Sequence, residues 1–257
     1  MKQKTIYYDD ERNNEFSGIV KNTVKVDKDF KYIRRGPFFS AVKFIVYRVI
    51  MTPVAFIYTK LKFGLKIRNK SVLKGYRKKG YFIYSNHTLM AGDAFIPNMY
   101  CFPKTTYMIV HPDNISTKGT KNFIMMCGAI PTPNAFDGFR NFNSTIEKRI
   151  KEGSAICIYP EAHIWPYYTK IRDFPDTSFA YPIKLDAPVF SATVTYSKRK
   201  FIKIPKVTVY IDGPFLKNSD LKPREAQKEL RNQVYSAMIK RAENSTYEVI
   251  RYIKKED

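Results

Sequence analysis

Cysteine is scarce in this sequence of 257 residues, with only three, Cys101, Cys127 and Cys157, lying far apart. An odd number of cysteines without the short spacings of a zinc site argues against a disulfide framework and against a thiolate metal centre. A secretory signal is also missing, because the first thirty residues are polar and contain no apolar core. We therefore expect a protein of a reducing compartment that holds no metal.

A long uncharged apolar run, an internal repeat and a Gly/Ser-rich linker are likewise missing. Within the aromatic and aliphatic segment 38–63 the longest uncharged run is Val49–Thr59, well short of the roughly 20 residues of a transmembrane helix. Lys and Arg residues interrupt the segment, which favours a helix or helical hairpin lying in the membrane interface, its basic stems reaching toward lipid phosphates. An ordinary pair of core helices is the alternative.

Acidic residues are few, 23 against 45 Lys and Arg, so the formal charge is +22. Such a field attracts phosphate-bearing partners, whether anionic lipids, nucleic acids or nucleotides. No recognisable nucleic-acid-binding motif is present. The aromatic residues lie in apolar runs and are not interleaved with a basic patch as a stacking platform would require. We therefore expect anionic membrane lipids, and no nucleic acid, as partners.

Short apolar runs alternate with polar stretches from residue 81 onward, which predicts an α/β domain whose mixed, partly parallel sheet is flanked by helices. The expected strands are 81–84, 106–110, 155–159, 189–196 and 207–211. The expected helices are 120–127, 144–152 and 223–255. We divide the chain into a polar N-terminal arm (1–35), a membrane-docking helical segment (36–66) and the α/β domain (67–257).

Only three histidines occur, and His87 directly follows the strand expected at 81–84. Catalytic groups are commonly presented on loops at the carboxyl ends of strands. A histidine with a neighbouring carboxylate can take a proton from a hydroxyl near neutral pH, and Asp93 is the nearest acid. Six positions along a straight helix would turn Asp93 about 240° away, so the loop must bring the two together, with Gly92 relaxing the backbone. A structural histidine and a helix-capping aspartate are the alternative.

Asn86-His87 followed by Asp93 resembles the first signature block of the glycerol-phosphate acyltransferase family. Three later segments resemble the second, third and fourth blocks of the family in the same order. They are Gly128–Pro131 with Arg140, Tyr159-Pro160-Glu161, and residues 181–190. The resemblance spans about residues 80–215, and residues 38–65 are similar to the membrane-docking helices of the family.

The resemblance implies transfer of a fatty acyl group from acyl-CoA or acyl-carrier protein to the free hydroxyl of 1-acyl-glycerol-3-phosphate, which forms phosphatidic acid. It implies no cofactor, and a peripheral or monotopic protein on the cytoplasmic face of the cell membrane. His87 would be the general base, oriented by Asp93. Arg140 would hold the acceptor phosphate, since a guanidinium suits that oxygen cluster, and Glu161 would contact a glycerol hydroxyl. The other expected substrate-binding residues are Asn86, Gly128, Pro160 and His163.

Two features depart from the family pattern. Five residues separate His87 from Asp93, where the family usually has four. The third block reads Glu161-Ala162-His163-Ile164-Trp165 in place of Glu-Gly-Thr-Arg, with His163 as a possible replacement contact to the acceptor. Another lysophospholipid or a glycolipid therefore stays open as acceptor, and a non-enzymatic basic protein that binds lipid or nucleic acid is the alternative class.

Overall fold

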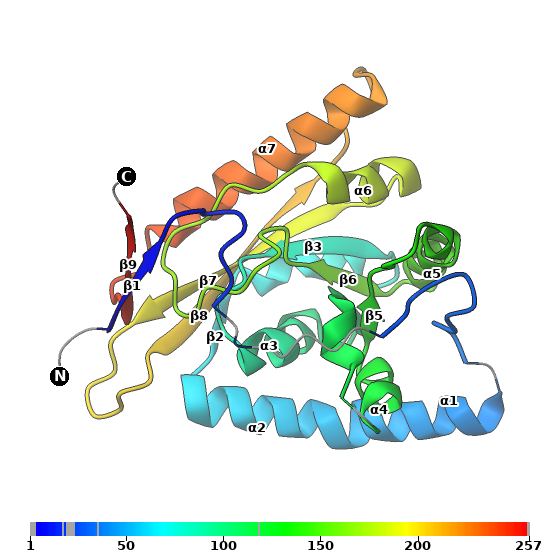
Figure 1. Cartoon of the computed structure of the whole chain (residues 1–257), viewed down its shortest axis with the longest axis horizontal. Helices are drawn as coiled ribbons and strands as arrows, with labels where there is room; N and C mark the ends of the chain where they lie inside the picture. The colour runs from blue at the N-terminus through cyan, green and yellow to red at the C-terminus, as the bar shows by residue number, and fades with distance from the viewer. Residues whose placement is uncertain (1–3, 17, 19–23, 35, 118, 256–257) are drawn as a thin grey trace.

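A seven-stranded sheet forms the centre of the molecule, in the order β2-β8-β7-β3-β6-β4-β5 (Figure 1). The computed structural model describes residues 4–16, 18, 24–34, 36–117 and 119–255. Only β7 and β8 pair antiparallel, and the other neighbours in this sheet are parallel. The strands are β2 (Lys66–Arg68), β3 (Tyr81–Ser85), β4 (Thr106–Val110), β5 (Ala129–Pro131), β6 (Ala155–Ile158), β7 (Val189–Ser197) and β8 (Lys206–Phe215). The predicted α/β fold with a mixed, partly parallel sheet is confirmed, and the sheet is parallel at every pairing except that of β7 with β8.

Helices cover both faces of this sheet, which explains why the central strands read as continuous apolar runs. Alternate residues of β3 serve the two faces: Ile83 packs on the side of α3 (Ala91–Cys101), and Phe82 on the side of α5 (Phe139–Lys151) and α7 (Pro223–Ala242). The short helices α4 (Lys121–Met126) and α6 (Ala180–Leu185) complete the domain. Every predicted strand is present, and the short strands β2 and β5 were not predicted.

The segment 37–63 is one continuous helix of 27 residues, long and apolar enough to cross a membrane. It consists of α1 (Pro37–Phe44), a π-helical stretch (Ile45–Met51) and α2 (Thr52–Phe63), so the hairpin left open by the sequence does not form. At 1.5 Å per residue the helix is about 40 Å long. In Figure 1 it runs along the base of the domain.

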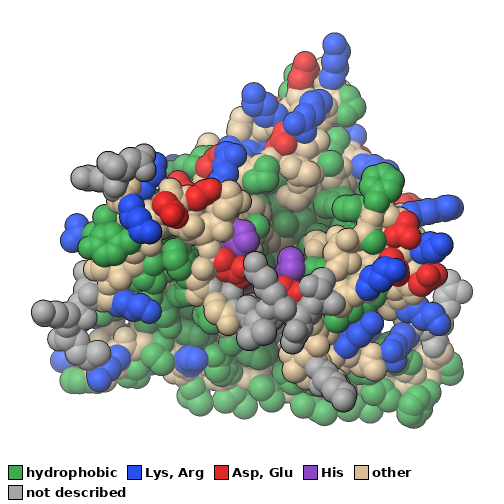
Figure 2. Space-filling view, viewed as in Figure 1, with side chains coloured by type: hydrophobic (Ala, Val, Ile, Leu, Met, Phe, Trp, Pro, Cys, Tyr) green, Lys and Arg blue, Asp and Glu red, His purple; other side chains and the backbone are tan. Residues whose placement is uncertain are grey.

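The inner side of this helix is bound to the domain by hydrogen bonds. The Tyr47 hydroxyl accepts from the backbone N–H of Thr106 at 2.9 Å, and Asn98 Nδ2 donates to Thr52 Oγ1 at 3.0 Å. The outer side is apolar and exposed to solvent, and Figure 2 shows it as a hydrophobic band along the base. We call it the apolar face, and its members include Phe44, Ile45, Val49, Ile50, Val54, Phe56, Ile57 and Leu61. A docked helix with an outward apolar face fits peripheral membrane association.

The two ends of the chain meet in a separate two-stranded parallel sheet formed by β1 (Lys4–Tyr8) and β9 (Ile250–Lys254). The helix expected over 223–255 therefore ends at Ala242, because residues 250–254 pair with the N-terminal strand. Trp165 lies under this sheet, fully buried, and its Nε1 donates to the carbonyl of Asn14 at 2.8 Å. The described part of the N-terminal arm is thus packed against the domain.

Candidate active site

His87 and Asp93 form a hydrogen-bonded pair at the carboxyl edge of the sheet. His87 lies in the loop after β3, and its Nδ1 is 2.7 Å from Asp93 Oδ2. The Asp93 side chain is 4% exposed and the His87 side chain 24%. Because a carboxylate only accepts hydrogen bonds, it favours the tautomer with the proton on Nδ1 and leaves Nε2 free to accept one. On the face of the molecule that Figure 2 shows, histidine side chains lie beside carboxylates in a central hollow.

The backbone between the two residues is irregular and then helical. Asp93 lies in the first turn of α3, and its Oδ2 also accepts from the N–H of Leu89 at 2.9 Å. The irregular residue of this loop is Met90, with φ 41° and ψ −120°, whereas Gly92, which we expected to relax the backbone, lies in the first turn of α3. Gly92 is required for another reason, since a Cβ there would lie 2.9 Å from Leu89 Cβ and 3.2 Å from the Phe63 ring. The five intervening residues are therefore accommodated by a sharp entry into the helix.

Tyr159, at the end of β6, supports both members of the pair. Its ring stacks on His87 with centroids 4.5 Å apart and an interplanar angle of 24°. Its hydroxyl donates to the Asp93 carbonyl at 2.7 Å. Burial raises the pKa of Tyr159 well above its ordinary value, so this hydroxyl remains a neutral donor. The residue thereby limits the motion of the imidazole.

Glu161 holds the backbone of His87 through a buried ion pair. One carboxylate oxygen accepts from the His87 N–H at 3.0 Å and from Arg172 Nη2 at 3.2 Å, and the other accepts from the Arg172 N–H at 3.0 Å. Burial raises the pKa of Glu161, and the Arg172 guanidinium opposes that rise. Both side chains are at most 1% exposed. Both carboxylate oxygens of Glu161 thus bind groups of the protein itself and hold the loop of His87, and its expected contact to an acceptor hydroxyl stays a prediction.

Arg172 is the member of the site that the sequence did not reveal. It lies in an irregular segment eleven residues past Glu161, and nothing in its neighbourhood separates it from the other 44 basic residues. Its guanidinium also donates to the carbonyl of His163 and stacks over Trp165, 4.8 Å from the ring centroid. The partner of a buried carboxylate is found only when the fold is known.

The unusual third block fixes the catalytic loop through its backbone. The N–H of Trp165 donates to the His87 carbonyl at 3.0 Å, and the N–H of Tyr167 donates to the Thr88 carbonyl at 2.8 Å. Both peptide groups of His87 are therefore held, one by Glu161 and one by Trp165. The segment after Glu161 thus clamps the loop that carries His87 through two backbone hydrogen bonds.

Three expected substrate-binding residues have other surroundings. The Asn86 side chain is buried and makes two bonds to the backbone of Val194 in β7, at 2.8 and 3.1 Å. Gly128 precedes β5 at the amino end of that strand, the opposite edge from His87, and a Cβ there would lie 2.4 Å from the Thr106 carbonyl oxygen. Pro160 is buried between Tyr159 and Glu161. Asn86 and Gly128 thus make contacts within the sheet, Pro160 lies in the turn that carries Glu161, and a role of the three residues in substrate binding stays a prediction.

The remaining two expected contacts are accessible. Arg140 is exposed in the first turn of α5, beyond the carboxyl end of β5. Two strands separate β5 from β3, a distance of about 14 Å between the strand axes, so Arg140 is at the same edge as His87 but does not touch it. The His163 side chain is 34% exposed and lies 3.7 Å from Glu15 in the N-terminal arm. Their roles toward a substrate remain predictions.

A second histidine–carboxylate pair lies at this edge of the sheet. His111, after β4, has its Nδ1 3.2 Å from Asp113 Oδ2, but its side chain is 67% exposed. Its Nδ1 also accepts from the Asp113 N–H at 3.3 Å, so it caps a short helical turn. No aromatic ring of the described residues stacks on His111, and the pair provides a natural control for experiments on His87.

Thiolate and metal chemistry have no obvious residues to carry them within the described ranges. Burial raises the pKa of Cys101 and Cys127 to about 11 and that of Cys157 to about 12, so these thiols are protonated at neutral pH. Among the residues that the structure describes, no three His, Cys, Asp or Glu side chains gather as a metal ligand set. The chemical groups that the described site does present are those of the His87–Asp93 pair.

Comparison with known proteins finds similarity in the fold and not in the sequence. No protein-family model matches the chain, and no curated protein matches it. Among solved structures it is similar to PlsC from Thermotoga maritima, a 1-acyl-sn-glycerophosphate acyltransferase. The TM-score is 0.57 at 14% sequence identity, over 84% of this chain and 86% of that one. The resemblance read from the sequence is thus confirmed in the fold, and the chain has the fold of a 1-acyl-sn-glycerophosphate acyltransferase.

Proposed function

We propose that this protein is an acyltransferase that moves a fatty acyl group from a thioester donor, acyl-CoA or acyl-carrier protein, to the free hydroxyl of 1-acyl-glycerol-3-phosphate. The observation that carries the proposal is the clamped His87–Asp93 pair at the carboxyl edge of the sheet. The likeness of the fold to PlsC supports the same reading. The product would be phosphatidic acid.

The proposed reaction is a direct transfer without an acyl-enzyme. The acceptor oxygen attacks the thioester carbonyl while His87 Nε2 takes its proton, and Asp93 stabilises the imidazolium that forms. The C–S bond of the tetrahedral intermediate then breaks, and the imidazolium returns the proton to the leaving thiolate. The protonated cysteines support this choice, since a covalent thiol route would need a thiolate. The proposed reaction uses no cofactor.

The membrane surface is the proposed place of reaction, on its cytoplasmic side. The acceptor carries one acyl chain, and the apolar face of the helix 37–63 would hold the catalytic edge next to the lipid headgroups. The net charge of +22 would favour an anionic surface and phosphorylated substrates. High salt should therefore weaken the association.

The test is an acyl-transfer assay with purified protein, radiolabelled acyl-CoA and a panel of lysophospholipids in anionic vesicles, repeated with an acyl-carrier-protein donor. His87→Ala should abolish transfer while the protein stays folded. His111→Ala, which removes an exposed histidine from the same edge, should keep most of the activity. Full activity in His87→Ala would refute the mechanism, and no transfer to any acceptor would refute the function.

A different acceptor is the second candidate, and the third block favours keeping it. Glu161 is engaged with Arg172 and His87, so the acceptor hydroxyl has to be recognised by other groups. If another lysophospholipid or a glycolipid is acylated faster than 1-acyl-glycerol-3-phosphate in the same panel, the acceptor assignment changes while the reaction class stands. A basic lipid-binding protein without activity would instead bind vesicles and transfer nothing.

A further inference from the structure

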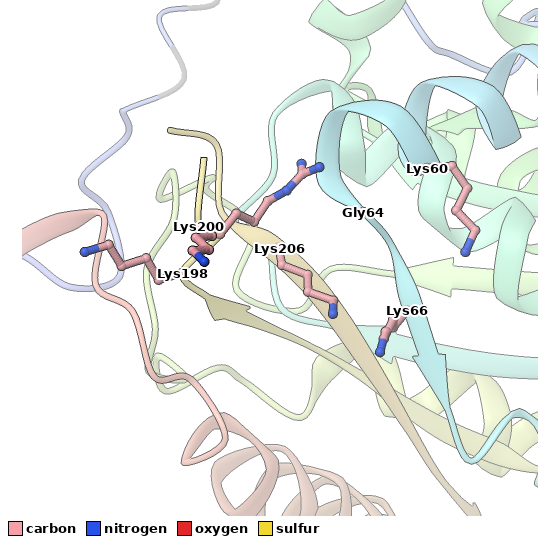
Figure 3. A pocket seen from close by; sticks show the side chains of 7 residues that line it. Lys60, Gly64, Lys66, Lys198, Lys200 and Lys206 are labelled. Atoms are coloured by element: carbon pink, nitrogen blue, oxygen red, sulfur yellow. The ribbon is translucent and has the colours of Figure 1, made fainter. Parts of the chain in front are cut away.

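A strongly basic cavity lies beside the carboxyl end of α2 (Figure 3). Its volume is about 470 Å³, and it is lined by Lys60, Gly64, Lys66, Lys198, Arg199, Lys200 and Lys206. None of these described lining residues is acidic. We call this cavity the basic pocket. Figure 3 shows Lys60, Lys66 and Lys206 directed to the same side, from α2, β2 and β8, whereas Lys198 points away.

The cations of the basic pocket repel one another. Lys66 and Lys206 lie on the paired strands β2 and β8, and the neighbouring Lys66 ammonium lowers the pKa of Lys206. Arg199 is held in place, because its Nη1 donates to the Lys62 carbonyl at the end of α2 at 2.8 Å. Like charges kept together in this way gain stability when an anion enters.

An apolar groove continues from the basic pocket and shares Lys60 and Lys66 with it. The groove measures about 950 Å³, and its apolar lining includes Pro53, Phe56, Ile57, Leu65, Ile67 and Phe102. The cations at its other end include Arg48 and Lys70, which donate to backbone carbonyls of Pro103 and Met99 at 2.9 Å. Among the described cations of the two cavities, Lys60, Lys66 and Lys206 come from three separate elements and are directed to one side, while Lys200 and Arg68 add further positive charge to the lining (Figure 3).

The groove opens beside the apolar face of the helix 37–63, because Phe56 and Ile57 belong to both. From Pro53 to Lys60 the helix rises about 11 Å at 1.5 Å per residue, which is long enough for a substantial part of an acyl chain. Neither cavity is lined by His87, Asp93 or Tyr159. The combined site is therefore at the membrane side of the molecule and separate from the histidine–aspartate pair.

We propose that the basic pocket and the apolar groove together bind one anionic phospholipid of the membrane. Its phosphate would lie among Lys60, Lys66 and Lys206, and one acyl chain would lie along the groove. The joined basic and apolar lining matches a charged headgroup attached to a chain, which a free nucleotide or inorganic phosphate does not offer. A lipid held here would fix the depth and orientation of α2, and so of the catalytic edge, in the membrane.

The test uses a phosphatidylglycerol with a photoactivatable diazirine near the end of one acyl chain, diluted in phosphatidylcholine vesicles. After irradiation of the full-length protein, labelled peptides are quantified by mass spectrometry. The readout is the ratio of labelling in the groove, at residues 65–67, to labelling of the apolar face at residues 44–50. This ratio corrects for any loss of membrane binding.

The test variant is Lys60→Gln/Lys66→Gln/Lys206→Gln, and the matched control is Lys222→Gln/Lys228→Gln/Lys240→Gln, which removes the same charge from the region of α7. Each basic residue near an anionic surface changes binding roughly fivefold. The ratio should therefore fall by at least about tenfold in the test variant and stay unchanged in the control. The same probe on phosphatidylcholine should give a low ratio in the wild type.

Three results would overturn the proposal: absence of groove labelling in the wild type, equal ratios for the two lipids, or an unchanged ratio in the triple variant. Loss of labelling on adding CoA would also overturn it, since the cations would then belong to a donor site. The proposal does not depend on acyl transfer, and the His87→Ala protein should label as the wild type does. Failure of either hypothesis can thus be recognised separately.

Discussion

Replacing Asp93 with Asn tests the central pair at nearly constant shape. Asp93 Oδ2 accepts both His87 Nδ1–H at 2.7 Å and Leu89 N–H at 2.9 Å. An Asn oxygen in the same place can keep both bonds, but the negative charge that stabilises the imidazolium is lost. The variant should therefore fold, and only the step that protonates His87 should become slower.

The size of the effect follows from the spacing and burial of the pair. Two unit charges about 4 Å apart interact by about 4 kcal/mol at an effective dielectric constant of about 20. Each 1.36 kcal/mol in the barrier is about tenfold in rate, so full loss of this interaction corresponds to about a thousandfold. Because the His87 side chain is 24% exposed, water screens part of it. We expect kcat to fall about 100- to 1,000-fold.

The assay is steady-state acyl transfer with the best acceptor of the panel, run with thermal denaturation of the same samples. Asp113→Asn is the matched control, since it changes the carboxylate of the exposed His111 pair, and it should keep kcat within about threefold of the wild type. A kcat for Asp93→Asn within tenfold of the wild type, at unchanged melting temperature, would refute the role of Asp93.

Three further predictions concern the ion pair, the acceptor and the membrane. Arg172→Met leaves the buried Glu161 carboxylate unpaired, which should lower the free energy of unfolding by about 3–5 kcal/mol, or the melting temperature by roughly 6–20 °C. Burial raises the folded-state pKa of Glu161 above its unfolded value. The loss of stability should therefore grow as pH rises through the folded pKa and shrink at acidic pH, which calorimetry measures. Arg140→Ala should raise the KM for a phosphorylated acceptor about tenfold with kcat nearly unchanged, and a change in melting temperature alone would make Arg140 structural. Leu61→Asp, at a site 73% exposed, should reduce vesicle co-sedimentation about tenfold or more without changing the melting temperature, and undiminished co-sedimentation would exclude the apolar face as the docking surface.

Much of the catalytic edge could be predicted from local pattern alone. The run Tyr81–Ser85 reads as a buried strand because both faces of the sheet are covered, and a histidine directly after it stands where parallel strands end. The pairing with Asp93 followed from chemistry and the nearest acid. The path between them did not, because a positive φ at Met90 is unusual for a residue with a side chain and has no local signature in the sequence.

The short strands and the closure of the chain ends depend on long-range pairing. Residues 250–254 continue a polar, helix-compatible stretch, and they form a strand only because residues 4–8 lie beside them. The same holds for β2, three residues that pair with β8. Local propensity is a weak signal for strands whose hydrogen-bond partners are distant in sequence.

The sequence by itself determined the α/β class, the strands that carry the candidate site, and the histidine and aspartate that would act there, because buried strands and proton-transfer groups have local signatures. Only the tertiary structure decided what holds them. In the fold, Glu161 binds Arg172 and the His87 backbone. Asn86 and Gly128 contact neighbouring strands of the sheet, and Trp165 is buried against the segments at the two chain ends. The fold also placed three lysines of separate elements around one cavity. These contacts depend on packing between segments that are distant in the sequence, and the local sequence pattern of either segment does not predict its partner.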